Sequence, residues 1–365
     1  PGVKIMSCQI FSGMYAGTVL EEVRAIKYAA DNGAVILQCS WGYISGAANP
    51  FEWTPQYSTD EEWETYNVLE RKALDYFIHH AGSPDGVIDG GLAIFAGGNE
   101  AAPAASYPGA YPDFVAVAAT AGDFTPAVYS NYGPGTTISA PGGDQDYYWE
   151  YADDDHWVGE IGCVLSTLPL HVSESGYGYM EGTSMATPQV SGVIALGLSY
   201  ALEQRKHFKA QEFIDLLHSS ATKFDDSVYK GEKKWYKYVI DMGKNHPSLM
   251  KMSDYKGKMG HGLVNAGALL DAIDGADVPT MTFPNVTLAE GADRTIDPAM
   301  YFVKGNTLDY TVTVENAAVA EAKVVSGKVV VTAKAAGQTA AVVRGGSSEQ
   351  KFVITVRKTY SGNGW

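Results

Sequence analysis

An alternation of helical and strand-like stretches, which continues to residue 273, is the strongest constraint on the fold. Residues 19–30 have the amphipathic spacing of a helix, and they lead into the apolar run 35–39, which is typical of a buried parallel strand. A similar apolar run recurs at 93–96. Because such strands must be covered on both faces, the pattern predicts an α/β fold with helices on both sides of a parallel sheet.

A different pattern begins beyond residue 273. The helical pattern stops near 274–279, and short segments with alternating apolar and polar residues follow, beginning at 308–315. Glycine-containing turns separate the further segments at 328–334, 339–344 and 351–358. We therefore expect one domain at residues 1–273 and a small antiparallel β-sandwich of the immunoglobulin-like type at 274–365.

The segment 182–188, Gly-Thr-Ser-Met-Ala-Thr-Pro, carries the clearest chemical signal. It places Ser184 at the start of an Ala-, Gly- and Leu-rich run, which predicts a close-packed buried helix to about Gln204. Unpaired N–H groups and the helix dipole at this end favour negative charge, which suits a serine that attacks a carbonyl. Pro188 has no N–H, so the carbonyl of Ser184 loses its usual helical donor.

These residues resemble the nucleophile motif of the subtilases, the subtilisin-like serine endopeptidases. One departure is Gln189, because the family usually has histidine after the proline. Other similar segments follow the family's order at 107–112, 130–133 and 140–142. The resemblance implies a subtilisin-like fold for residues 1–273, a polypeptide substrate, and peptide hydrolysis through a Ser-His-Asp triad.

The resemblance also assigns roles around Ser184. Asn99 follows the apolar run at 93–96 and is implied to donate its side-chain amide to the oxyanion, beside the N–H of Ser184. The substrate-binding residues implied in the same way are Ser40, Trp41, Gly42, Gly97, Gly98 and Thr183. Ser40–Gly42 would pair with the substrate backbone as an added strand, although Trp41 is equally interpreted as a packing residue.

Further expectations concern the walls of the substrate cleft. Ser106 and Glu100 are expected near the primary specificity pocket, where Glu100 either favours a basic substrate side chain or is a solvated rim charge. The segment 15–17 is expected to form the opposite wall. An insertion at 44–60, rich in Pro, Trp and Tyr, could extend the wall beside Ser40–Gly42.

Neither partner of the triad serine has a matching motif. No Asp-Thr-Gly or Asp-Ser-Gly ends an apolar strand, no His-Gly-Thr opens a helix, and the eight histidines are each interpreted as surface or satisfied side chains. Residues 1–6 resemble the strand after the family's histidine helix. We therefore expect the Asp and His segments to precede residue 1, a sheet incomplete at its N-terminus, and an isolated chain without peptidase activity.

Three explanations for this absence stay open. The chain is a product of proteolytic nicking, with its N-terminal fragment retained as a partner or lost; or it is a shortened form; or it is a noncatalytic remnant. The last corresponds to an alternative function, a subtilase-fold protein that binds peptides or acts in adhesion without catalysis.

Composition limits the partners and the location. The net charge of -16 argues against nucleic acid, whose phosphates require a basic surface. No apolar run reaches the length of a membrane span. Cys8, Cys39 and Cys163 form no disulfide framework, and the first two are expected in strands. The family resemblance implies a secreted, cell-surface or periplasmic protein.

An acidic insertion at 143–160 raises the question of metals. Carboxylates can bind calcium, and the resemblance implies structural calcium in many members, with no cofactor required for the reaction. The spacing of Asp144 and the acidic residues after it does not match a defined calcium loop. No metal ligand is therefore assigned, and the pattern favours a solvated loop.

Overall fold

The structure is a computed structural model that describes residues 2–12, 15–45, 56–145, 162–235, 248–276, 281–302 and 305–358. The chain divides into two compact units. The first comprises Pro1–Gly82, Gly90–Gly197 and Ala210–Ile273, and the second Ser83–Asp89, Leu198–Lys209 and Asp274–Trp365. Each unit has a hydrophobic core. That the boundary at 273/274 separates independently folding domains stays a prediction.

A parallel sheet of four strands forms the centre of the first unit. Its order is β3 (Ile36–Cys39), β5 (Leu92–Ala96), β6 (Val115–Thr120) and β7 (Ile138–Pro141). All three pairings are parallel. The strands β5 and β6 are buried along their whole length, as their apolar sequences require, whereas β3 is an edge strand and is only partly buried.

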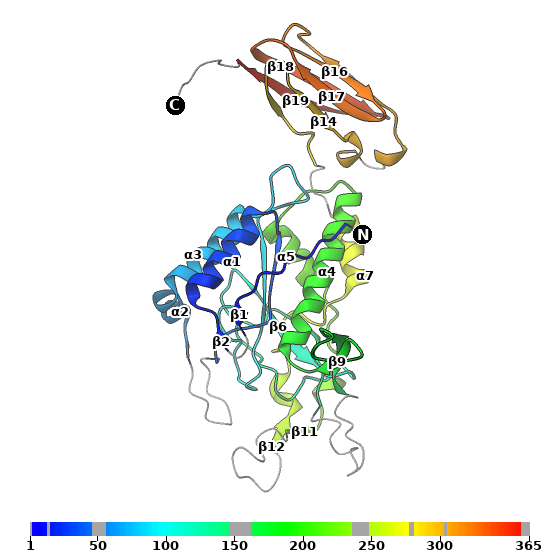
Figure 1. Cartoon of the computed structure of the whole chain (residues 1–365). Coiled ribbons are helices and arrows are strands. Elements are labelled where there is room, and N and C mark those ends of the chain that lie inside the picture. Colours follow the sequence, from blue (N-terminus) through cyan, green and yellow to red (C-terminus); the bar gives the residue numbers. More distant parts are fainter. Residues whose placement is uncertain are drawn as a thin grey trace. The chain divides into compact units, whose positions relative to one another are not determined.

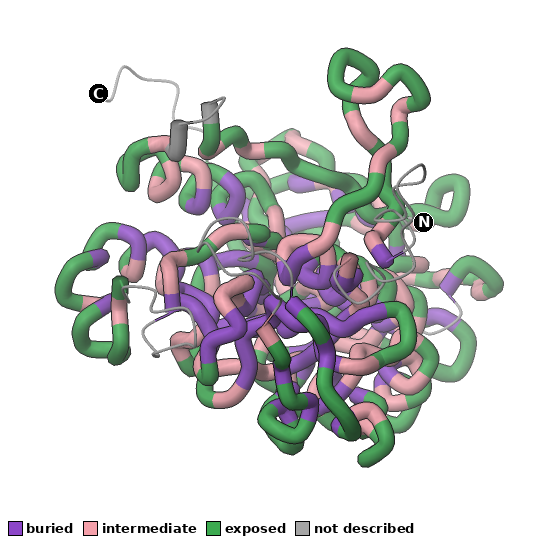
Figure 2. The backbone as a smooth tube through the Cα atoms, turned by 90° about the horizontal axis from the view of Figure 1, so that it is seen from below, coloured by how far each residue is buried: buried purple, intermediate pink, exposed green. Residues whose placement is uncertain are grey.

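Helices cover both faces of this sheet. On one side lie α1 (Val19–Asp31) and α3 (Val68–His80), and on the other α4 (Thr183–Glu203), α5 (Ala210–Ser219) and α7 (Ala266–Gly275) (Figure 1). The helix predicted at 19–30 is α1, which begins with a capping box between Thr18 and Glu21. Buried backbone runs through the interior of the unit (Figure 2). The predicted α/β fold is confirmed.

Shorter elements complete the first unit. They are β1 (Phe11–Ser12), β2 (Tyr15–Ala16), α2 (Asp60–Tyr66), β8 (Val164–Thr167), β9 (Tyr177–Met180), η3 (Asp226–Tyr229), β11 (Glu232–Trp235), β12 (Ser248–Lys251) and η4 (Met252–Tyr255). Three antiparallel pairs occur among them, β1 with β2, β8 with β9, and β11 with β12. The hairpin of β8 and β9 precedes the start of α4 directly.

The C-terminal part of the second unit contains two sheets. One has the order β13 (Val286–Ala289), β19 (Ser348–Arg357), β18 (Gly337–Gly345) and β15 (Tyr310–Val314); the other has β14 (Asp293–Ile296), β17 (Lys328–Ala333) and β16 (Ala320–Val325). Short turns η5 (Pro298–Met300) and η6 (Gly305–Thr307) connect strands, and β4 (Ile88–Asp89) pairs with β10 (Phe208–Lys209). The predicted antiparallel strands are confirmed, but β13 pairs with β19 in parallel.

Two expectations from the sequence need correction. Residues 2–10 form no strand, so Cys8 does not lie in one, and Ile5 is 95% exposed. An extended segment without a paired neighbour has no ladder hydrogen bonds to hold it as a strand. Cys39, in β3, is buried as expected.

The second correction concerns α4. Among the described helices, α4 alone is long and apolar enough, by length and composition, to cross a membrane. The expectation that no segment reaches that length was therefore wrong. The apolar residues have another use in this structure, because α4 buries Ala186, Val190 and Ile194 in the first unit, and buried core helices meet the same criterion.

Candidate active site

Ser184 lies in the first turn of α4, with its side chain partly exposed. Its hydroxyl donates to the carbonyl of Ser40 at 3.2 Å. Pro188 lies inside the helix and supplies no N–H to the carbonyl of Ser184. That carbonyl instead accepts a hydrogen bond of 2.7 Å from the hydroxyl of Ser40. The two serines, on α4 and after β3, are therefore joined by a reciprocal pair of hydrogen bonds.

The turn before Ser184 depends on Gly182. This glycine has φ +143°, in the region where an L side chain is strained, and a Cβ there would lie 3.6 Å from Nδ2 of Asn99. The N–H of Gly182 donates to the carbonyl of Gly142, just beyond β7, at 2.9 Å. The carbonyl of Gly182 accepts the N–H of Met185 at 2.9 Å. The turn before Ser184 is thus held from the end of β7 on one side and by its own helix on the other.

Asn99 is oriented by Thr183. Oδ1 of Asn99 accepts hydrogen bonds from the N–H and the hydroxyl of Thr183, at 2.9 and 2.8 Å. Because a backbone N–H can only donate, these bonds fix which end of the Asn99 amide is oxygen. Nδ2 is left without a hydrogen-bond partner among the described residues, and Asn99 and Ser184 are both partly exposed. This arrangement leaves one strong donor beside Ser184.

Gly98 makes room for a polar cluster next to Asn99. It has φ +106°, and a Cβ there would lie 2.1 Å from Nδ2 of Asn131 and 2.3 Å from Oγ of Ser106. Nδ2 of Asn131 donates to the carboxylate of Glu100 at 2.6 Å, and the hydroxyl of Ser106 donates to it at 3.4 Å. The structure therefore brings together Glu100 and Ser106, which the sequence predicts at one pocket, and adds Asn131.

The predicted substrate edge follows β3. Ser40 and Gly42 are exposed, whereas Trp41 is partly buried and packs edge-to-face on Phe95, with ring centroids 5.4 Å apart. The packing interpretation of Trp41 therefore has direct support. Gly97 is buried; its N–H donates to the carbonyl of Val117 at 2.9 Å, and its carbonyl accepts the N–H of Ser106 at 2.8 Å. Substrate binding by these residues stays a prediction.

The remaining wall predictions are tested only in part. Tyr15 and Ala16 form β2, and a wall role for 15–17 stays a prediction. Most of the insertion at 44–60 lies outside the described residues; at its edges, Ser45 forms a bridge with Tyr57.

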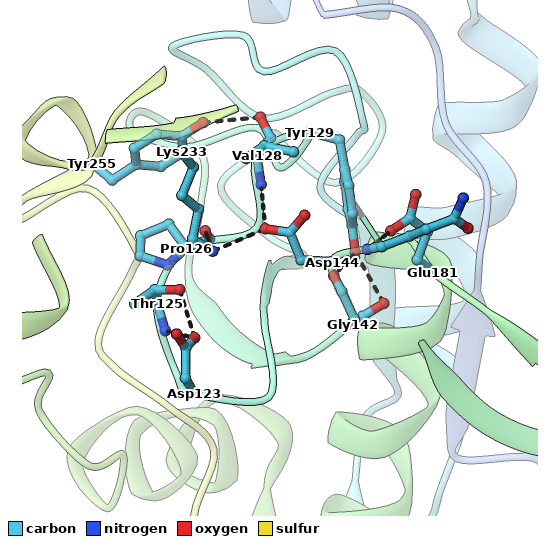
Figure 3. A network of polar contacts seen from close by, with 12 residues as sticks. Asp123, Thr125, Pro126, Val128, Tyr129, Gly142, Asp144, Glu181, Lys233 and Tyr255 are labelled. Carbon is cyan, nitrogen blue, oxygen red and sulfur yellow. Dashed lines mark hydrogen bonds and ion pairs between the residues drawn. The ribbon is translucent and has the colours of Figure 1, made fainter. Parts of the chain in front are cut away.

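A buried ion pair joins β11 to the segment that follows β7 (Figure 3). Nζ of Lys233, in β11, is 2.9 Å from Oδ2 of Asp144, and the two residues are 4% and 0% exposed. Asp144 was expected in a solvated loop, but its carboxylate is taken by Lys233 and by the N–H of Val128 at 3.1 Å. The rest of the acidic insertion, from residue 146, lies outside the described residues.

A second buried group joins α1 and α3. The carboxyl of Glu70 is fully buried and accepts hydrogen bonds from Nε1 of Trp63 at 2.9 Å and from the hydroxyl of Tyr43 at 3.2 Å. Burial and the neighbouring Glu70 raise the pKa of Glu22 to about 9. Burial also raises the pKa of Glu70. Glu22 therefore keeps its proton at neutral pH, and Tyr43 links this pair to the segment after β3.

Histidines and metals give no further candidate within the described part of the chain. None of the described histidines contacts Ser184; His80 stacks on Tyr76, and His218 stacks on His261. Burial lowers the pKa of His218 to about 4. The described residues hold no group of three or more His, Cys, Asp or Glu side chains suited to a metal ion.

Sequence reasoning made Ser184 and Asn99 candidates, but it did not indicate the contacts that orient them. The hydroxyl of Thr183 was placed at the site without its role in holding Asn99. Asn131 was visible in the segment 130–133, but its bond to Glu100 requires the fold. Lys233 and Glu70 carried no local signal, because lysine and glutamate in polar segments usually face water.

The chain is similar to known proteins. A model of the subtilase family matches residues 1–235. Pyrolysin from Pyrococcus furiosus is 28% identical over 302 residues, which cover 76% of this chain and 18% of pyrolysin. The extracellular basic protease of Dichelobacter nodosus is 31% identical over 146 residues, which cover 39% of this chain and 21% of that protein. The chain thus spans less than a quarter of either relative.

A solved structure is also similar. The prenylagaramide maturation protease PagA matches with a TM-score of 0.46 and 22% sequence identity, over 73% of this chain and 72% of that one.

Proposed function

The chain belongs to the subtilase family, and from that premise we propose that it supplies the nucleophile and the oxyanion donor of a serine endopeptidase. The observation that carries this proposal is the geometry at the start of α4. Ser184 lies at a helix N-terminus, and Thr183 holds the oxygen of Asn99, so that the Nδ2 donor is left for another acceptor. Two donors, Nδ2 of Asn99 and the N–H of Ser184, would then stabilise a tetrahedral oxyanion.

The mechanism assigns one step to each residue of this chain. Ser184 attacks the carbonyl carbon of a peptide bond, and its proton passes to a histidine that carries it to the leaving amine. For this attack the hydroxyl must exchange its bond to the carbonyl of Ser40 for a bond to that histidine. Water then releases the acyl group. We propose that the His and its orienting Asp are supplied by polypeptide outside residues 1–365, and that the isolated chain is inactive without it.

The same proposal extends to the class of substrate and to the compartment in which the protein acts. The exposed backbone of Ser40 and Gly42 is suited to pairing with an extended polypeptide. Glu100, held by Asn131 and Ser106, favours a basic side chain in the primary specificity pocket. We further propose that the protein acts outside the cytoplasm, in line with the name of the extracellular relative from Dichelobacter nodosus.

Labelling with a fluorophosphonate tests the nucleophile. The protein isolated from its source is treated with the probe before denaturation, and intact-mass and peptide mapping locate the adduct. We expect an adduct on Ser184, found together with a polypeptide that carries the Asp and His, and no adduct after Ser184→Ala. Ser191→Ala is the matched control, because Ser191 lies on the same helix and its hydroxyl bonds only to the carbonyl of Thr187.

Two results would contradict the proposal. Peptide hydrolysis that survives Ser184→Ala would assign the activity to another group. A protein that takes up no probe and hydrolyses nothing, yet binds extended peptides, would support the noncatalytic peptide-binding function instead.

Asn99→Ala tests the oxyanion donor separately. Loss of one such donor raises the barrier by about 3 to 4 kcal/mol, so kcat should fall about 10²- to 10³-fold with little change in KM. An unchanged kcat would remove Asn99 from the site.

A further inference from the structure

The ion pair of Asp144 and Lys233 is almost completely buried in the first unit. Nζ of Lys233 contacts Oδ2 of Asp144 at 2.9 Å and the carbonyl of Pro126 at 2.8 Å (Figure 3). A buried pair of this kind is often no more stabilising than apolar residues of the same size, although loss of one partner is costly. Stability alone therefore does not account for the ion pair, and the two segments that it connects indicate what else it does.

One of those segments is the loop 126–131, which reaches toward Asn99. Asp144 accepts the N–H of Val128 at 3.1 Å, and the hydroxyl of Tyr255 donates to the carbonyl of Val128 at 3.2 Å. The next carbonyl, that of Tyr129, accepts the N–H of Ala101 at 2.8 Å. Ala101 is two positions from Asn99, so the ion pair holds the loop that supports the oxyanion donor.

The other segment is 142–145, which reaches the nucleophile turn. The hydroxyl of Tyr129 donates to the carbonyl of Gly142 at 2.9 Å. The same carbonyl accepts the N–H of Gly182 at 2.9 Å. Three residues on, the N–H of Gln145 donates to the carboxylate of Glu181 at 2.5 Å. The segment that carries Asp144 is therefore hydrogen-bonded to Glu181 and Gly182, the two residues that precede Thr183.

We propose that Asp144 and Lys233 are positioning residues, which set the distance between Asn99 and Ser184 by fixing the loop 126–131 against the segment 142–145. This inference rests on the proposed peptidase function. Neither side chain touches the reacting atoms; each acts through Ala101 or Gly182. A misplacement of about 1 Å at a catalytic centre can cost on the order of 10²-fold in rate, so such a clamp has a measurable effect.

The kinetic test separates position from stability. In the complete peptidase, Lys233→Met should lower both the melting temperature and kcat, because Asp144 keeps a buried charge without its ammonium partner. The double variant Lys233→Met, Asp144→Leu should regain much of the melting temperature lost in Lys233→Met, short of the parent because the N–H of Val128 loses its acceptor. Its kcat should stay on the order of tenfold or more below that of the parent, with KM little changed. Lys256→Met, which removes an exposed ion pair with Asp226, is the control and should change neither quantity.

Hydrogen exchange tests the positioning role of Asp144 and Lys233 without a measurement of catalysis. In the double variant, exchange should accelerate by about tenfold in peptides that cover 97–102 and 180–186, as expected when buried hydrogen bonds are weakened. Exchange in β5 and β6 should stay unchanged. Because this readout needs no activity, it decides the positioning claim even if Ser184→Ala shows that the peptidase proposal is wrong.

Tyr129→Phe is a second variant for the case in which the double variant does not fold. It removes the hydroxyl bonds to Gly142 and Gly143 and leaves the charges in place. We expect kcat to fall about tenfold, with faster exchange at 180–186. The proposal is overturned if kcat and the melting temperature recover together in the double variant, or if exchange in the Asn99 and Ser184 segments is unaffected in a folded variant.

Discussion

The pair of hydrogen bonds between Ser40 and Ser184 is the residue-scale feature with the most direct chemical meaning. Pro188 removes the donor that a helix would supply to the carbonyl of Ser184, and the hydroxyl of Ser40 takes its place at 2.7 Å. The sequence predicted the missing donor from the proline alone. It could not predict the replacement, because Ser40 is 144 residues away in the chain.

Ser40→Ala should therefore weaken catalysis more than stability. The carbonyl of Ser184 would lose one hydrogen bond, worth about 1 kcal/mol, and the first turn of α4 would shift, so kcat of the complete peptidase should fall about three- to tenfold. Steady-state kinetics with a peptide substrate measure this effect. Ser253→Ala, at an exposed serine of η4, serves as the control, and equal kcat values for the two variants would contradict the expectation.

Glu22 gives a residue-scale prediction about pH. In the folded protein its pKa is raised to about 9, whereas an unfolded glutamate titrates near about 4.3. Between these values the folded state binds more protons than the unfolded state, so the contribution of Glu22 to stability is present at low pH and is lost as pH rises through this window.

Glu22→Gln should remove that loss. The variant should show a smaller decline in the free energy of unfolding between pH 5 and pH 8.5 than the parent, in urea titrations. Glu61→Gln, at an exposed carboxylate in the first turn of α2, should follow the parent. If Glu22→Gln also follows the parent, Glu22 is not a buried, protonated group.

At the scale of elements, the candidate site residues lie in turns that follow strands. The strand β5 ends at Ala96, and the turn after it carries Gly98, Asn99 and Glu100 in succession. Gly98 has a positive φ, and its missing side chain leaves the space that Asn131 and Ser106 occupy. A Gly-Gly-Asn sequence is typical of a turn, but it does not indicate the two side chains that fill this one.

Gly98→Ala tests this turn. Gly257→Ala is a matched control, because Gly257 also has a positive φ, of +72°, but its Cβ would meet nothing within 4 Å. The control should lose about 1 kcal/mol from backbone strain alone, whereas Gly98→Ala should lose about 2 kcal/mol or more beyond that, since backbone or side chains must move. Urea unfolding compares the two, and similar losses would mean that the cluster at Gly98 is easily displaced.

The elements themselves were predictable where the pattern was strong. Residues 19–30 had amphipathic helical spacing, and the run from Ser184 was rich in Ala, Gly and Leu; α1 and α4 cover these two stretches. The strands β13, β14 and β16 were missed. Two of them are only four residues long, and β13 pairs in parallel with β19, a partner found far along the chain. Such pairing depends on tertiary contacts that local alternation does not encode.

The same limit applies to the site. Ser184 and Asn99 lie in compact motifs, so the sequence alone makes them candidates. Asp144 and Lys233 are 89 residues apart, and each on its own is a charged residue among other charged residues. Their pairing becomes visible only when β7 and β11 are brought together in the first unit.

At the scale of the whole molecule, the division into two compact units can be tested by calorimetry. The first has Ile94 in its central sheet and the second has Ile354 in its sandwich core, each with 0% exposure. If the sandwich folds as an independent domain, calorimetry should resolve two transitions. Ile94→Ala should destabilise the transition of the first unit and Ile354→Ala that of the second, each by about 2 to 5 kcal/mol in the free energy of unfolding. A single transition lowered by both variants would mean that the units fold together and that the boundary at 273/274 is not a domain boundary.

The bond between Ser40 and the carbonyl of Ser184 also bears on how such chains can diverge. A residue with an N–H at position 188 would supply the donor that Ser40 now provides, so the hydroxyl at position 40 would become dispensable. Conversely, a chain that loses this hydroxyl first leaves the carbonyl unsatisfied until position 188 changes. We expect the two positions to be epistatic, with loss of the hydroxyl at position 40 better tolerated once position 188 carries an N–H.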